Sequence, residues 1–93
     1  MQSIEILIQV QPLRHSKSAE EVAGRYQVFV PADIEPGNRA DIAIESFHRA
    51  IPVSNLEDFE ITISDARSGQ EIVPTYEEVG TVFDCKKYEE DLA

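Results

Sequence analysis

The sequence is poor in the residues that mark common chemical sites. Its one cysteine, Cys85, cannot close an intramolecular disulfide, which excludes a disulfide-stapled secreted scaffold. The four glycines stand singly and form no glycine-rich phosphate loop. His15 and His48 are 33 positions apart and make no zinc pattern with the cysteine. We therefore expect no metal and no cofactor.

The sequence also shows no arrangement of residues that is typical of a catalytic site. A cysteine nucleophile needs a histidine base beside it, and nothing in the sequence places either histidine near Cys85. Acidic pairs such as Glu57-Asp58 and Glu77-Glu78 could bind a hard cation weakly, but they lack the regular spacing and the central glycine of a calcium loop. Paired carboxylates could serve general acid–base catalysis, but so many acids make chance pairs unavoidable, and no pair stands out. We expect that the protein is not an enzyme.

Basic residues are scarce: eight Lys and Arg stand against 18 Asp and Glu, for a formal net charge of −10. Residues 1–30 sum to zero, so the whole excess of acid lies in residues 31–93. Such a chain repels phosphate backbones and anionic lipids, so we expect no direct binding to nucleic acid and no membrane contact. The natural complement is a basic surface on a partner protein. The alternative is a solvated surface that only keeps the protein soluble.

Long apolar runs are also absent. The longest near the start, Ile4 to Val10, is interrupted by Glu5 and Gln9 and is too short for a signal peptide or a membrane span. We therefore expect a cytoplasmic protein. With 93 residues, of which 42 % are apolar, the chain can build one core. This predicts a single small domain over residues 1–93.

What the sequence does contain is alternation. Apolar and polar residues alternate in three segments, 3–11, 25–31 and 59–64, and this period of two predicts β-strands. Shorter runs at 71–73 and 81–83 predict one brief strand and one further strand near the C-terminus.

The connections between these strands differ in kind. Asp65 and Gly69 suit a short hairpin turn after the third strand. Residues 13–24 are polar and read as a mobile loop that holds one helical turn, with a capping-box pattern at Ser18. We expect the charged tail, residues 86–93, to be frayed.

One helix is predicted over residues 39–51, with Asn38 as its N-cap and Pro52 as its stop. At 100° per residue its apolar positions form one stripe: Ala40, Ala43, Ile44, Phe47, Ala50 and Ile51. A single helix must bury this stripe on the sheet, which predicts a two-layer α+β fold with a mainly antiparallel sheet of three to five strands. The order strand-strand-helix-strand-strand is also compatible with a β-grasp arrangement.

Two places on this fold are candidate partner-binding surfaces. The sheet face away from the helix would be mostly polar, with Leu7 and Phe29 as its apolar residues. They form either the centre of a binding patch or part of a core covered by the C-terminal segment with Val82, Phe83 and Tyr88. On the outer side of the helix, Ile42 lies among charged residues that include Glu45, and the same question applies to it.

The acidic residues Glu57, Asp58 and Glu60 complete the candidate set. Our leading hypothesis is a small acidic protein-interaction module that occupies a basic surface, in its sharper form a nucleic-acid-mimicking inhibitor. The size and charge are similar to those of small acidic proteins of phages and mobile elements, including anti-CRISPR inhibitors, although the similarity covers composition and no motif. The alternative is a self-associating structural protein, a homodimer that pairs through the open sheet face.

Overall fold

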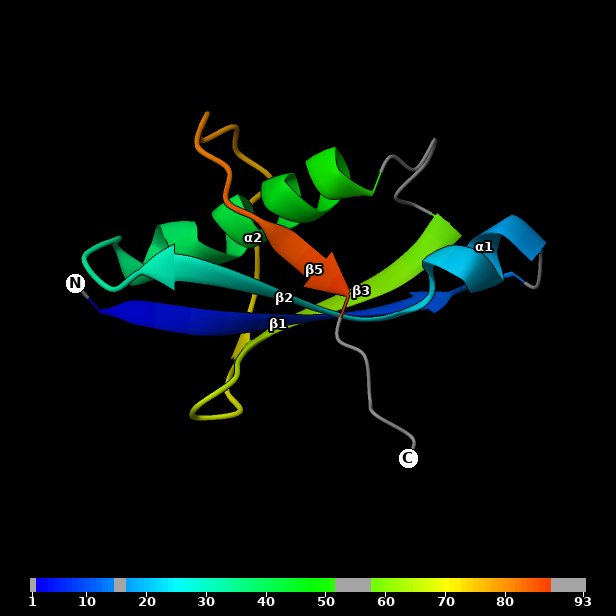
Figure 1. Ribbon diagram of the computed structural model, residues 1–93, viewed down its shortest axis with the longest axis horizontal. Helices are drawn as coiled ribbons and strands as arrows, with labels where there is room; N and C mark the ends of the chain where they lie inside the picture. The colour runs from blue at the N-terminus through cyan, green and yellow to red at the C-terminus, as the bar shows by residue number, and fades with distance from the viewer. Residues whose placement is uncertain (1, 15–16, 52–57, 88–93) are drawn as a thin grey trace.

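The computed structural model describes residues 2–14, 17–51 and 58–87. In chain order the elements are β1 (Ser3–Pro12), α1 (Lys17–Val22), β2 (Gly24–Pro31), α2 (Pro36–Ala50), β3 (Phe59–Asp65), β4 (Glu71–Ile72) and β5 (Cys85–Lys87) (Figure 1).

The strands form one sheet in the order β4-β3-β1-β2-β5, and every neighbouring pair is antiparallel. The long helix α2 packs on one face of this sheet (Figure 1). The predicted α+β class with an antiparallel sheet is therefore confirmed. A β-grasp sheet would require a parallel pair of strands, and the described strands contain none.

The strand β1 lies at the centre of the sheet, and its regular alternation places its apolar residues on one face. Ile6, Ile8 and Val10 point toward α2 and are almost fully buried. The facing positions of β2 repeat the pattern with Tyr26 and Val28. Period-two burial on both central strands fixes their register, because a slip of one residue would turn every apolar side chain to the other face.

The helix α2 begins earlier than its sequence predicts. It starts at Pro36 with Glu35 in the N-cap position, so Asn38 lies inside the first turn and is not the cap. Proline is well placed at the first helical position, because it needs no N–H partner there and its φ is already helical. The stripe packs on the sheet through Ala43 and Phe47, both fully buried.

The predicted strand at 81–83 is wrong in position. After β4 the chain leaves the sheet and passes α2, and it returns to the sheet only as β5 (Figure 1). We call this connecting segment, residues 73–84, the strap. The N–H of Phe83 donates to the Ser46 hydroxyl of α2, 3.0 Å away, so the backbone there is bonded to the helix instead of to a strand.

The strand β5 also corrects the expected tail. Lys86 and Lys87, which the sequence placed in the frayed end, pair with Gln27 and Tyr26 of β2. Residues 88–93 lie outside the described part of the chain.

The connection between β1 and β2 contains α1, a helix of six residues that begins one residue before Ser18. Its Val22 packs against the core, and the Val22 carbonyl accepts a hydrogen bond from the Tyr26 hydroxyl at 2.6 Å. Gly24 follows with φ +143°, a conformation that residues with a side chain rarely adopt, and the Lys87 Cε lies 3.0 Å from where a Cβ would stand. The glycine therefore lets the chain turn from α1 into β2 beside β5.

Candidate functional site

The face of the sheet opposite α2 carries neither of the described helices (Figure 1). Leu7 and Phe29 both point to it, as the alternation predicts: Leu7 is half-buried and Phe29 is 51 % exposed. Leu7 pairs with Gln27 and Phe29 pairs with Glu5, so the two apolar residues are diagonal neighbours on adjacent strands. We call this surface the open face.

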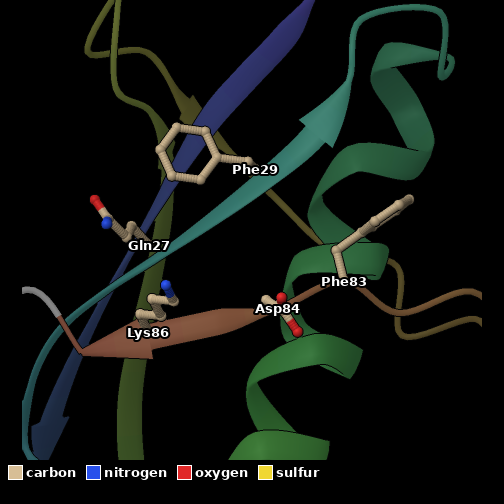
Figure 2. A pocket seen from close by; sticks show the side chains of 5 residues that line it. All are labelled: Gln27, Phe29, Phe83, Asp84 and Lys86. Atoms are coloured by element: carbon tan, nitrogen blue, oxygen red, sulfur yellow. The ribbon is translucent and has the colours of Figure 1, made fainter.

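Phe83 packs against the core, to which neither Leu7 nor Phe29 belongs, and its N–H is bonded to α2. Val82 is half-buried, and Tyr88 lies outside the described residues. Phe29 and Phe83 instead line a groove of about 290 Å³, together with Gln27, Asp84 and Lys86 (Figure 2). The groove lies where β2 continues to Pro31 without a partner in β5, because β5 begins only at Cys85, opposite Val28.

The structure contradicts the interpretation of Ile42 as an outward-facing contact residue. Ile42 is only 2 % exposed and belongs to the core. On the helical wheel it lies between Glu45 and Ser46, and both of these side chains are bonded to the strap. The strap therefore covers the side of α2 that was expected to face solvent.

Glu45 is engaged for the same reason. Its Oε2 accepts the N–H of Val79, 3.2 Å away, and the side chain is half-buried. The remaining acidic candidates lie elsewhere: Asp58 and Glu60 are exposed at the start of β3, and Glu57 is outside the described residues. The structure thus does not bring Glu45 together with the pair at β3.

A second hollow lies where the strap meets α2, with a volume of about 190 Å³. We call it the strap hollow. Its lining residues are Asp41, Ile44, Glu45, His48, Tyr76, Glu77 and Glu78. Four of these seven residues are acidic and none is Lys or Arg. The Tyr76 side chain is 66 % exposed, so an aromatic ring stands among the acids.

Asp41 builds the wall of the strap hollow. It is 2 % exposed, and its two carboxyl oxygens accept hydrogen bonds from the Thr75 hydroxyl at 2.6 Å and from the Tyr76 N–H at 2.7 Å. Tyr76 has φ +62°, in the left-handed region that non-glycine residues seldom occupy. The bond from its N–H to Asp41 helps to hold this backbone in place, and with it the ring.

Sequence reasoning missed the strap hollow. Its polar contacts join residues 34 or 35 positions apart, and no local period reports such pairings. Asp41 gave no separate signal, because in a helix expected to begin at Arg39 it stands in the first turn, where an aspartate is favourable.

Cys85, the first residue of β5, packs against the core, and its thiol is half-buried. This burial raises the pKa of Cys85 from its ordinary 9.0 to about 11. The same cause, loss of solvent, raises the pKa of Tyr26, with the nearby Cys85 as a lesser contribution. The thiol therefore stays protonated at neutral pH, and it is not an activated nucleophile.

The described part of the chain holds no group of three or more His, Cys, Asp or Glu side chains arranged to bind a metal ion. Among its helices, none has the length and apolar character that crossing a membrane requires. The fold and its surfaces define a small α+β protein with a five-stranded antiparallel sheet, one open sheet face and an acidic hollow on the opposite side. Comparisons of the chain with protein-family models, with curated proteins and with solved structures gave no match.

Proposed function

We propose that the protein is a small acidic interaction module that binds a basic surface of a partner protein through the strap hollow. The observation that supports this is the grouping of four acidic side chains around the exposed ring of Tyr76. A guanidinium or ammonium group of a partner suits such a site. Carboxylates accept its hydrogen bonds, and the face of an aromatic ring attracts a cation.

The residues of the strap hollow contribute to cation binding in different ways. Glu77 and Glu78 are exposed and supply the negative charge that a cation meets first. Glu45 is half-buried at the base, and its carboxylate keeps acceptor sites beyond the one that binds Val79. Asp41 positions the Tyr76 backbone from behind. The net charge of −10 adds long-range attraction toward any basic surface.

A more specific form of this proposal is nucleic-acid mimicry, in which the carboxylates occupy a phosphate-binding groove of the partner. An inhibitor of the kind carried by phages and mobile elements would act in this way. Its support is the charge and the small size of the chain. A partner captured from the native host at low salt should then be released by duplex DNA but not by a neutral polymer. Release by both, or by neither, would contradict mimicry.

The site itself is tested with labelled oligoarginine and oligolysine peptides, whose binding is followed by fluorescence anisotropy as the salt concentration rises. The variant Glu77→Gln with Glu78→Gln removes two charges from the hollow. A matched control, Asp58→Asn with Glu60→Gln, removes two exposed charges elsewhere. We expect the hollow variant to bind about tenfold more weakly than the control, and Tyr76→Ala to weaken binding of oligoarginine more than that of oligolysine.

The outcomes distinguish binding at the strap hollow from attraction by the net charge of the whole protein. If both double variants lose the same affinity, the attraction belongs to the net charge and the strap hollow is not the site. If neither peptide binds the wild-type protein at low salt, the interaction-module proposal itself fails.

A further inference from the structure

The strand register places one residue from each strand in a straight row across the open face. From β4 to β5 the row is Glu71, Ser64, Leu7, Gln27 and Lys86. Each member points away from α2, because its neighbours along the strand are the core-facing residues. Figure 2 shows the β5 end of the row, where Gln27 and Lys86 lie on neighbouring strands.

This row is self-complementary. An acid stands at one end, a base at the other, and the apolar Leu7 lies at the midpoint on the central strand. A two-fold rotation about an axis along β1 turns the row end for end. In two sheets related in this way, each acidic end faces a basic end, and the two leucines meet at the axis.

We propose that two copies of the chain pack open face to open face about such an axis, with Glu71 of each copy opposite Lys86 of the partner subunit. Packed sheets cross at about 30°. The row ends lie about 10 Å from the axis, so this crossing displaces them by about 5 Å. Glutamate and lysine side chains are long enough to bridge that displacement, and both are exposed.

The charge of the open face also favours a second copy over other occupants. The charged strand residues on it are Glu5, Glu60, Glu71, Arg25 and Lys86, three acids and two bases, which sum to −1. The whole chain carries −10. Little charge therefore opposes the approach of two copies through this face, and a strongly basic partner finds little charge to bind there.

The area of the open face limits the stability of the dimer. The five strands differ in length and together hold 30 residues, each covering about 16 Å², so each copy offers about 500 Å². The dimer would bury about 1,000 Å² in total, which is in the range of weak and transient interfaces. Phe29, 51 % exposed and diagonal to Leu7, adds an aromatic side chain near the centre. We expect a dimer whose population depends on concentration.

A charge swap measured by sedimentation velocity over a concentration series tests the proposal. Glu71→Lys and Lys86→Glu each place like charges opposite one another twice per dimer, so each should raise the dimer dissociation constant about tenfold or more. The double variant restores two opposite-charge pairs and should recover the wild-type constant. Asp33→Lys, the same charge change at an exposed residue outside the strands, is the matched control.

The Glu71→Lys variant separates specific pairing from bulk repulsion. It lowers the net negative charge, so bulk repulsion alone would make the dimer stronger, whereas the row predicts that it becomes weaker. Leu7→Glu gives an independent check, because it places two acids at the axis and should yield a folded monomer by circular dichroism and sedimentation. A wild-type monomer at all concentrations, or a double variant as weak as the single ones, would overturn the proposal. The basic-partner proposal uses the other side of the molecule and stands or falls separately.

Discussion

Both sides of α2 are buried, but by different kinds of contact. The side that faces the sheet is apolar: Ala43 and Phe47 are fully buried against β1 and β2. The side that faces the strap is polar: Asp41, Glu45 and Ser46 accept hydrogen bonds from strap residues. One helix thus joins a hydrophobic layer to a hydrogen-bonded clamp.

The two kinds of contact have different consequences: apolar burial mainly stabilises the fold, and the hydrogen bonds position the strap. Apolar burial is non-directional and grows with area, so the sheet side of α2 contributes more to the folding free energy than the strap side does. A hydrogen bond adds less net free energy, but it fixes the distance and direction between two groups. The clamp therefore decides where the strap runs, and with it the position of Tyr76 in the strap hollow.

The largest expected effect comes from the sheet side. Phe47 meets Tyr26 edge to face, with ring centroids 4.9 Å apart. Phe47→Ala should lower the free energy of unfolding by about 3–5 kcal/mol, a large part of the stability of a domain of this size. Urea denaturation followed by circular dichroism measures it. Phe47→Leu, which keeps most of the volume, should cost far less, and equal losses for both variants would show that the ring contact with Tyr26, and not the apolar volume, supplies the stability.

A smaller and more local effect is expected from the clamp. Asp41→Ala removes the acceptor of two hydrogen bonds and should lower the free energy of unfolding by about 2–3 kcal/mol. Amide hydrogen exchange should quicken first at Tyr76, before the amides of β1 respond.

The control for the clamp is Asp33→Ala, which removes an exposed acid and should change stability by less than about 0.5 kcal/mol. If Asp41→Ala instead loosens the strap and β1 together, the two sides of α2 form one cooperative unit and the contrast between them disappears.

The same contrast explains how much of the fold the sequence predicted. The alternation in β1, β2 and β3 is local, and so is the spacing of the apolar stripe of α2; all four elements lie where these patterns place them, within a few residues. The turn after β3 also follows local chemistry: the Asp65 side chain accepts the N–H groups of Arg67 and Ser68, and Gly69 takes φ +75°.

The path of the strap, and the contacts that depend on it, could not be predicted from local sequence patterns. Ile42 looked exposed because a helical wheel assumes one buried side, and the polar residues around it gave no hint that another segment covers them. Phe83 has a strand-like neighbourhood in the sequence, yet its N–H is bonded to Ser46, 37 positions away. Leu7 and Phe29 were placed on the open face by alternation, but their neighbours across the sheet required the register, which sets Leu7 opposite Gln27 and Phe29 opposite Glu5.

The smallest expected effect concerns Cys85, at the β5 edge of the apolar layer between the sheet and α2. Cys85 of β5 packs against the core, and its pKa is raised to about 11 because the thiolate would lose solvent. In the unfolded chain the thiol ionises near its ordinary 9.0, so the unfolded state releases a proton at a pH where the folded state keeps it. The contribution of Cys85 to the free energy of unfolding should therefore be constant well below pH 9 and fall as the pH rises from 9 to 11, by an amount of the order of 1 kcal/mol. Cys85→Ala removes the titrating thiol and should make the fall in this range shallower, while the loss from Tyr26, whose raised pKa acts at higher pH, stays. If the variant falls as steeply as the wild type, the thiol is solvated, and the apolar layer ends at β2 instead of reaching β5.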